Sequence, residues 1–219
     1  MPDVGPARTT VRGRGAAFQP PNRFRARSTG ERSVDFRYEP LEVESWGDDW
    51  GPGEAGEPGV RTLYLRDASR SIIARNDSPD IAFDASVNPY RGCEHGCAYC
   101  YARPTHEFLG LSAGVDFESR ILVKTDAPKL LRAALGRRGW SPQLLAMSGV
   151  TDPYPPIEKR LEITRGCLEV LADFRNPVGI VTKSHLVARV IDHLTALAEH
   201  RAASVAISIT SLDARLARS

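Results

Sequence analysis

The sequence lacks the features that would place a protein in a membrane or outside the cell. No apolar run approaches the ~18 residues that span a bilayer, and the first residues, MPDVGPARTTVRGRG, lack the apolar core of a secretory signal. Net charge is also small, because 29 basic and 27 acidic residues leave only +2 over 219 residues. Such a chain has no strong overall field for nucleic acid or lipid. We therefore expect a cytoplasmic protein that does not enter the membrane.

Cysteine is scarce and unevenly placed, which excludes a disulfide framework. Three of the four cysteines, Cys93, Cys97 and Cys100, fall within eight residues, and Cys167 stands alone. Secreted disulfide scaffolds are short and spread many cysteines along the chain. A tight cluster instead indicates metal or redox chemistry in a reducing compartment.

Residues 1–60 lack periodic apolar residues and are rich in Gly, Pro and Arg. The first half of this segment is basic and the second half acidic, and neither half can bury enough apolar surface to offset the entropy of ordering. We expect residues 1–60 to form a disordered arm, with a nucleic-acid contact arm as the alternative. Residues 61–219 are expected to form the folded domain.

The folded part shows the alternation of an α/β protein. Short apolar or β-branched runs recur near 84–90, 119–124, 143–149, 177–183 and 203–210, with helical patterns between them. This order predicts βαβ units and a parallel sheet. Two further extended segments, TLYLRD and SIIARN, precede these runs.

Two helical stretches have clear apolar faces. One face of a helix expected over 157–174 carries an apolar stripe of Ile163, Cys167, Val170, Leu171 and Phe174, so Cys167 is expected to be a buried, inert thiol. A second stripe begins at Leu186, after Ser184 as a candidate N-cap, and continues at the positions Val190, Leu194 and Leu197.

The last runs predict how the sheet is covered. The run 177–183 is continuously apolar, as expected for a strand covered on both faces. In the run 203–210, Val205, Ile207 and Ile209 should face helices, while the small polar residues face a ligand. Five such units are fewer than a closed eightfold barrel requires. We expect a partial TIM-type barrel, whose last apolar edge is covered by a partner or a further segment.

The three clustered cysteines form a C-x3-C-x2-C motif within Asn88–Tyr101, directly after the first core strand. Ligands of parallel α/β folds gather at the carboxyl ends of strands, and Gly92 and Gly96 allow the tight turns that convergent thiolates need. Three thiolates leave a tetrahedral zinc or a cubane iron–sulfur cluster one ligand short. A zinc site completed by His95, His106 or Cys167 therefore remains an alternative.

The C-x3-C-x-aromatic-C pattern, with Tyr99 as the aromatic residue, resembles the cluster motif of radical S-adenosylmethionine (SAM) enzymes. The resemblance implies a (β/α) barrel fold and a [4Fe-4S] cluster held by Cys93, Cys97 and Cys100, with Tyr99 beside the bound SAM. It also implies reductive cleavage of SAM to methionine and a 5′-deoxyadenosyl radical, with electrons from a flavodoxin- or ferredoxin-type donor.

The same resemblance implies SAM contacts at the ends of later strands. Thr151 and Asp152 follow the third core strand and are implied contacts for the amino group or ribose of SAM. Lys183 could meet the SAM carboxylate, and the hydroxyls of Ser184 and Ser208 could bind SAM or substrate. The alternatives are a turn-forming role for Asp152 and an N-cap role for Ser184, and we expect Glu158 to be a helix-start residue.

A narrower resemblance concerns the substrate. The runs RGRGA, NPYRGCEHGCAYCYARPTHEFLG and TDPYPPIEKRLEITR resemble the branch of radical SAM proteins related to spore photoproduct lyase, which includes proteins labelled DNA-repair photolyases. This resemblance implies a lyase-like activity with damaged DNA as a candidate substrate. A non-catalytic metal-binding or scaffold module, derived from a truncated enzyme, is the alternative to an enzyme.

Overall fold

The computed structural model describes residues 15, 16, 18–24, 38–42 and 60–213. The chain divides into two compact units, and the expected boundary between residues 60 and 61 is not the boundary between them. Unit 1 contains residues 1–67 and 91–123, and unit 2 contains residues 68–90 and 124–219. Within the described ranges, no helix is both long and apolar enough to cross a membrane.

Unit 1 contains a small sheet with the strand order β1-β5-β4. β1 (Leu63–Arg66) pairs in parallel with β5 (Arg120–Val123), and β4 (Tyr90–Arg91) lies at the boundary of the units. The buried side chains of Leu65 and Leu122 pack with Leu111 in a core that also includes Tyr38. The run near 119–124 is therefore a strand, as expected, but it lies between β1 and β4 in this small sheet and not beside β3 or β6.

Two short helices complete unit 1. η2 (Arg103–Leu109) begins with a proline in its first turn and ends at Gly110, whose φ of 74° provides a left-handed C-cap. α1 (Val115–Ser119) places Phe117 in the core at 1% exposure. α1 leads directly into β5.

Two described parts of the arm make defined contacts within unit 1, which differs from the disorder expected for residues 1–60. Residues 38–42 flank β1, where the Leu41 N–H donates to the Tyr64 carbonyl at 2.8 Å. The Asn22 side chain is buried and donates to the carbonyls of Glu107 and Leu111 at 2.8 and 2.7 Å. Backbone and amide hydrogen bonds hold these segments, so an apolar pattern could not reveal them. The basic residues Arg8, Arg12, Arg14, Arg25, Arg27 and Arg32 lie outside the described residues.

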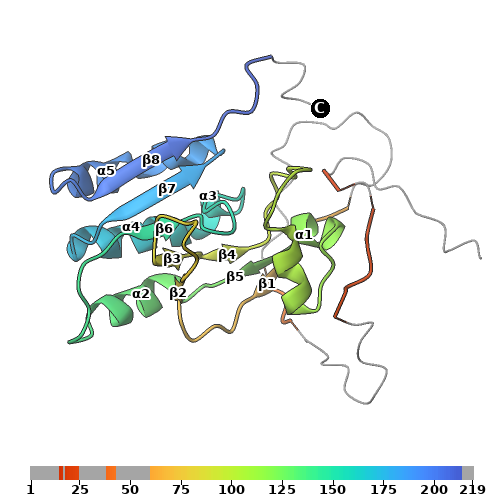
Figure 1. Ribbon diagram of the computed structural model, residues 1–219, viewed down its shortest axis with the longest axis horizontal. Helices are drawn as coiled ribbons and strands as arrows, with labels where there is room; N and C mark the ends of the chain where they lie inside the picture. The colour runs from red at the N-terminus through yellow and green to blue at the C-terminus, as the bar shows by residue number, and fades with distance from the viewer. Residues whose placement is uncertain (1–14, 17, 25–37, 43–59, 214–219) are drawn as a thin grey trace, which may run out of the picture. The chain divides into compact units, whose positions relative to one another are not determined.

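Unit 2 is built on a five-stranded sheet with the order β2-β3-β6-β7-β8 (Figure 1). β2 (Ile73–Arg75) is antiparallel to β3 (Ala85–Val87), and the remaining neighbours pair in parallel. The parallel strands that follow β3 are β6 (Leu145–Met147), β7 (Val178–Thr182) and β8 (Ala203–Ile207). The α/β class and the parallel sheet are confirmed, while the described strands form two separate sheets and no closed barrel.

The helices α2 (Ala127–Leu135), α4 (Ile163–Asp173) and α5 (Ile191–Ala198) lie side by side along the sheet of unit 2 (Figure 1). The stripe predicted on α4 is confirmed for Ile163, Cys167, Val170 and Leu171, which are all buried. Phe174, the C-cap of α4, is only half-buried. The helix expected over 157–174 is divided into α3 (Glu158–Leu161) and α4 by Glu162, whose φ is 50°. In η3 (His185–Val190), Ser184 is the N-cap, since its hydroxyl accepts the Leu186 N–H at 3.3 Å.

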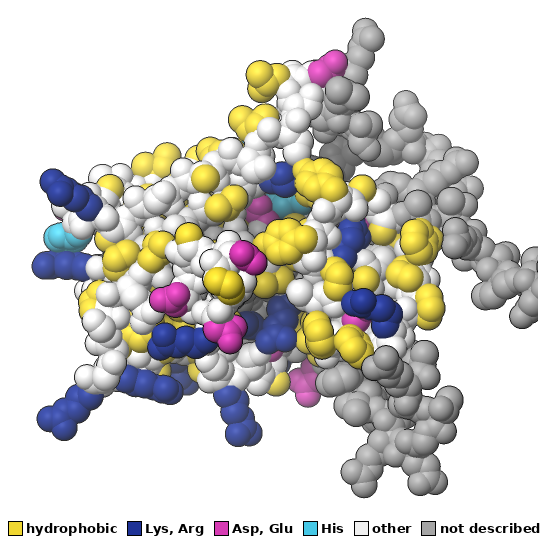
Figure 2. Space-filling model, in the orientation of Figure 1, with side chains coloured by type: hydrophobic (Ala, Val, Ile, Leu, Met, Phe, Trp, Pro, Cys, Tyr) yellow, Lys and Arg dark blue, Asp and Glu magenta, His cyan; other side chains and the backbone are white. Residues whose placement is uncertain are grey.

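The expected covering of the last two strands is wrong in part. In β7, Val178, Ile180 and Thr182 are buried, but Val181 is 53% exposed, so only one face is covered. Val205 pairs with the buried Ile180, so the Val205 side chain lies on the face that was expected to meet helices. Val205 is nevertheless 38% exposed. Ile207 and Ile209 are 59% and 68% exposed because, among the described residues, β8 pairs with β7 alone. In Figure 2, hydrophobic side chains lie scattered among white atoms over this part of unit 2.

Candidate functional site

The three clustered cysteines lie on the loop that follows β4, in unit 1. All three are half-buried, and within the described residues none of them is in a disulfide: Cys93, Cys97 and Cys100. Gly92 and Gly96 have φ values of 90° and 62°, which L side chains rarely adopt. The Cys93 N–H donates to the Phe117 carbonyl at 2.9 Å, and the Cys100 N–H donates to the Cys97 carbonyl at 3.1 Å. The predicted tight turns at both glycines are therefore present.

The thiols of this loop fit an iron–sulfur cluster by their chemistry. Cysteine thiolates are the ligands of [4Fe-4S] clusters, and all three cysteines of the loop are partly accessible. Within the described ranges, however, no three or more His, Cys, Asp or Glu side chains are gathered closely enough to hold a metal ion. The loop thus carries a suitable set of donors whose sulfur atoms are not gathered around one centre.

Arg103 and Glu118 stabilise the backbone of the cysteine loop. The Arg103 guanidinium donates to the Cys97 carbonyl from Nε at 3.2 Å and from Nη2 at 3.0 Å, and to the Gly114 carbonyl at 3.3 Å. It also forms an ion pair with Glu118, a carboxylate with 0% exposure. The Arg103 side chain thus binds the backbone of the cysteine loop. Glu118 was not predicted, because nothing in the local sequence pairs it with the motif.

Other residues near the motif have structural partners. Glu94 accepts hydrogen bonds from the Thr62 hydroxyl at 2.8 Å and from the Tyr64 hydroxyl at 3.1 Å. Arg91 forms an ion pair with Asp67 at 3.0 Å. Tyr99 is 70% exposed, which leaves its ring accessible beside the loop.

The two histidines considered as further metal ligands differ in their surroundings. His95 is half-buried between two of the cysteines. His106 has 0% exposure, its Nε2 lies 2.9 Å from the Arg120 carbonyl, and its ring meets Phe117 edge to face at 5.1 Å. Burial lowers the pKa of His106, which keeps the ring neutral. His106 is thus a core residue of unit 1.

In unit 2, polar side chains meet at the carboxyl ends of β6, β7 and β8. Asp152 follows β6 and accepts hydrogen bonds from the Thr182 hydroxyl at 2.8 Å and from the Lys183 N–H at 2.8 Å. The Lys183 ammonium donates to the Ser208 hydroxyl at 2.8 Å. The structure therefore brings together the predicted residues Asp152, Lys183 and Ser208. The Thr182 hydroxyl, which donates to Asp152, also belongs to this group.

Two other predicted SAM contacts already have backbone partners. The buried Thr151 hydroxyl donates to the Tyr90 carbonyl at 2.7 Å. Ser184 is the N-cap of η3, as the alternative interpretation held. The hydroxyls of Thr151 and Ser184 therefore stabilise the backbone at the strand ends.

Glu158 is buried, and it occupies the first turn of α3 as expected for a helix-start residue. Its carboxylate accepts the Tyr90 hydroxyl and the N–H groups of Ile163 and Arg165, both at 3.1 Å, at the start of α4. Burial raises the pKa of Glu158, and these hydrogen bonds oppose that shift. The carboxylate therefore caps α4.

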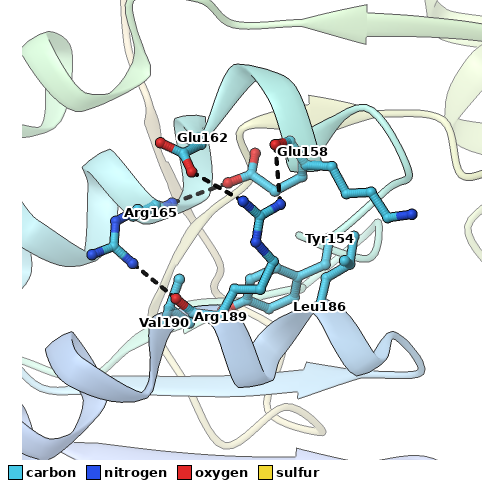
Figure 3. A pocket seen from close by; sticks show the side chains of 8 residues that line it. Tyr154, Glu158, Glu162, Arg165, Leu186, Arg189 and Val190 are labelled. Atoms are coloured by element: carbon cyan, nitrogen blue, oxygen red, sulfur yellow. Dashed lines mark hydrogen bonds and ion pairs between the residues drawn. The ribbon is translucent and has the colours of Figure 1, made fainter. Parts of the chain in front are cut away.

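A pocket beside Glu158 is too small for a cofactor. It has a volume of about 10 Å³, enough for roughly one water molecule. Arg189 pairs with Glu162 at 3.3 Å, and Tyr154 and Leu186 line the same pocket (Figure 3). The buried Tyr154 hydroxyl has no hydrogen-bond partner in the described part of the chain. We do not assign SAM to this pocket.

Comparison with known proteins defines the class. Residues 87–219, more than half of the chain, match the model of the radical SAM superfamily. The chain belongs to this superfamily. Its members use a [4Fe-4S] cluster and SAM, and they typically take electrons from flavodoxin or ferredoxin.

The relatives in the curated collection are uncharacterized proteins. The chain is 38% identical over 148 residues to the uncharacterized protein Rv2578c of Mycobacterium tuberculosis, which covers 66% of this chain and 44% of the relative. It is 35% identical over 106 residues to the uncharacterized protein MJ0683 of Methanocaldococcus jannaschii, covering 48% of this chain and 38% of the relative. The chain thus spans less than half the length of either relative. No solved structure matches it significantly.

Proposed function

We propose that this chain is a radical SAM enzyme that cleaves SAM reductively at a [4Fe-4S] cluster. The observation that carries the proposal is the set of three half-buried cysteine thiols on one loop, in a chain of this superfamily. When bound and reduced, the cluster supplies the electron that splits SAM into methionine and a 5′-deoxyadenosyl radical.

Cys93, Cys97 and Cys100 are the proposed cluster ligands. Three thiolates satisfy three of the four irons of a cubane cluster and leave one iron without a protein ligand. The positive φ values of Gly92 and Gly96 let the loop turn sharply on both sides of Cys93. Tyr99, with its exposed ring, is proposed to lie against bound SAM.

The strand ends of unit 2 are the proposed SAM-binding surface. The Lys183 ammonium can bind the SAM carboxylate, and the Ser208 hydroxyl can bind its ribose or amino group. Asp152 positions Lys183 through the Lys183 N–H and Thr182. Thr151 and Ser184 hold the backbone of this surface through their own hydrogen bonds. The location supports the proposal, since parallel α/β proteins bind ligands at the carboxyl ends of strands.

The substrate is a finer prediction. The prediction that damaged DNA is the substrate rests on the resemblance to the spore photoproduct lyase branch and on the basic half of the arm. Most of that half lies outside the described residues. Binding to ultraviolet-irradiated and intact duplex across a salt series checks it. Equal affinity for the two duplexes, or no binding, would remove DNA damage from the proposal.

Product analysis tests the central reaction. The full chain is reconstituted anaerobically with iron and sulfide, reduced, and given SAM, and 5′-deoxyadenosine and methionine are quantified. We expect both products from the unsubstituted chain and from Cys167→Ala, whose thiol is buried in α4. Cys100→Ala should form neither. Products at equal rates from Cys100→Ala would refute the assignment, and a cluster-loaded chain that forms none would favour a non-catalytic module.

A further inference from the structure

We propose that residues 15, 16 and 18–24, which precede the radical SAM match, brace the cysteine loop. In this proposal Gly15 and Glu118 are positioning residues for the thiols. All of the contacts involved lie within unit 1. The part of the proposal that concerns the cluster rests on the proposed function.

The brace is anchored on a buried carboxylate. Glu118 accepts the Gly15 N–H at 3.0 Å on Oε2 and the Ala16 N–H at 2.9 Å on Oε1. The same carboxylate forms the ion pair with Arg103, which donates to the Cys97 carbonyl. A chain of charge-assisted hydrogen bonds therefore runs from the arm through two side chains to the backbone of a proposed ligand. Bonds of this kind are stronger than neutral ones, and Glu118 has no exposed surface where water could replace them.

The arm also touches the loop directly at two glycines. A Cβ atom on Gly15 would lie 1.5 Å from the Gly96 carbonyl oxygen, closer than any contact that atoms tolerate. A Cβ on Gly96 would in turn lie 3.3 Å from the Gly15 nitrogen and from Glu118 Oε2. The two backbones pack against each other between Cys93 and Cys97, so only glycine at position 15 permits the contact.

The rest of the segment is held along η2 and α1. The Gln19 side chain accepts the Asp116 N–H at 3.1 Å, and the Ser112 hydroxyl donates to the Pro20 carbonyl at 2.5 Å. Arg23 donates to Glu107 from its backbone N–H at 3.1 Å and also forms an ion pair with it. These contacts, with the buried amide of Asn22, fix the segment at several points on the same elements that hold Cys93 and Cys97. The brace is a second support for the loop, in addition to the Cys93 to Phe117 hydrogen bond.

The test compares two glycine substitutions in the full chain. Gly15→Ala inserts a methyl group into the contact with Gly96, whereas Gly139→Ala adds the same group where nothing lies within 4 Å. Amide hydrogen exchange over residues 93–103 is measured in the metal-free chain. Iron and sulfide per chain, and the electron paramagnetic resonance spectrum of the reduced cluster, are then measured after anaerobic reconstitution.

We expect Gly15→Ala to speed exchange over 93–103 by about tenfold, because hydrogen bonds to a charged group are lost and local opening becomes easier. Exchange in α4 should stay unchanged, which shows that the variant is folded. Cluster content should fall at least by half, while Gly139→Ala matches the unsubstituted chain. Asn22→Ala, which loosens the brace at its far end, should shift both readouts in the same direction by less.

Identical exchange in Gly15→Ala and Gly139→Ala would overturn the brace. Faster exchange with unchanged cluster content and spectrum would overturn its role in positioning the thiols. If the unsubstituted chain takes up no cluster while Gly15→Ala still exchanges faster, the brace stands and the proposed function fails. The exchange measurement on the metal-free chain thus separates the two proposals.

Discussion

The two candidate binding regions differ in how far the chain has organised them. In unit 2, Asp152, Lys183 and Ser208 are already joined through hydrogen bonds at the strand ends. In unit 1, the cysteine loop has a fixed backbone, but its sulfur atoms are not gathered around one centre. The comparison teaches that a polar surface for a small molecule can be preformed by hydrogen bonds alone. A thiolate site is completed by its metal, because metal binding and local folding are coupled.

Of the substitutions that test this difference between the two regions, removing a cysteine of the loop should have the largest effect. Cys93→Ala, Cys97→Ala or Cys100→Ala each removes one of three thiolates, so the iron and sulfide content should fall to near background. Cys167→Ala should keep full content, because its thiol is buried within α4. Metal and sulfide analysis after reconstitution checks this. Equal loss in all four variants would contradict the division between the loop and Cys167.

Lys183→Met should affect binding more than folding. We expect the affinity for SAM to fall about tenfold, since a charge-assisted hydrogen bond is lost. The free energy of unfolding should change by less than about 1 kcal/mol, because the bond to Ser208 is solvent-exposed. Calorimetric titration of the reconstituted chain measures the first quantity and urea unfolding the second. Lys129→Met, at an exposed position on α2, is the matched control and should leave SAM affinity unchanged.

Asp152→Ala should lower stability, because this carboxylate organises the preformed surface. It accepts hydrogen bonds from the Tyr154 N–H, the Lys183 N–H and the Thr182 hydroxyl. We expect a loss of about 2 kcal/mol of unfolding free energy. Asp173→Ala removes only an exposed ion pair with Arg132 and should cost less than about 1 kcal/mol. Similar costs for the two variants in urea unfolding would show that Asp152 does not organise the strand ends.

His106 should make unit 1 sensitive to acid, with the smallest effect of the four. Its pKa is lowered in the folded chain, so below the ordinary value of about 6.5 the unfolded chain binds more protons. Stability from this residue is present at neutral pH and is lost as the pH falls below about 6.5 toward the lowered pKa of the folded chain, by about 1.4 kcal/mol for each pH unit between the two pKa values. Unfolding of the full chain and of His106→Phe at several pH values measures this. Parallel pH profiles would contradict the burial of a neutral ring.

Local patterns predicted much of the fold, because the residues that form it are close in sequence. Each of the five core runs contains a strand, and the buried face of α4 was visible in its spacing. The pairing of β5 with β1 was not visible, since strand order depends on contacts between distant segments. The exposure of Val205 and Ile207 could not be read from the alternation of β8, which fixes the face of a strand but not what covers it.

The residues of the candidate site likewise fall into those that the sequence predicts and those that depend on contacts between distant segments. The thiol motif and the hydroxyl and lysine groups at the strand ends stand out in the sequence, because their chemistry is carried by the residue type. Glu118 and Gly15 do not, because their roles depend on contacts 103 positions apart along the chain. The arm appeared too polar to order, and the structure orders part of it through backbone hydrogen bonds.

The measurement that tests the central claim most directly is the iron, acid-labile sulfide and zinc content of the full chain after anaerobic reconstitution. The account predicts about four irons and an equal amount of sulfide per chain, as a cubane cluster requires. These should be lost on substitution of any of Cys93, Cys97 and Cys100. Stoichiometric zinc without sulfide, or neither metal, would contradict it.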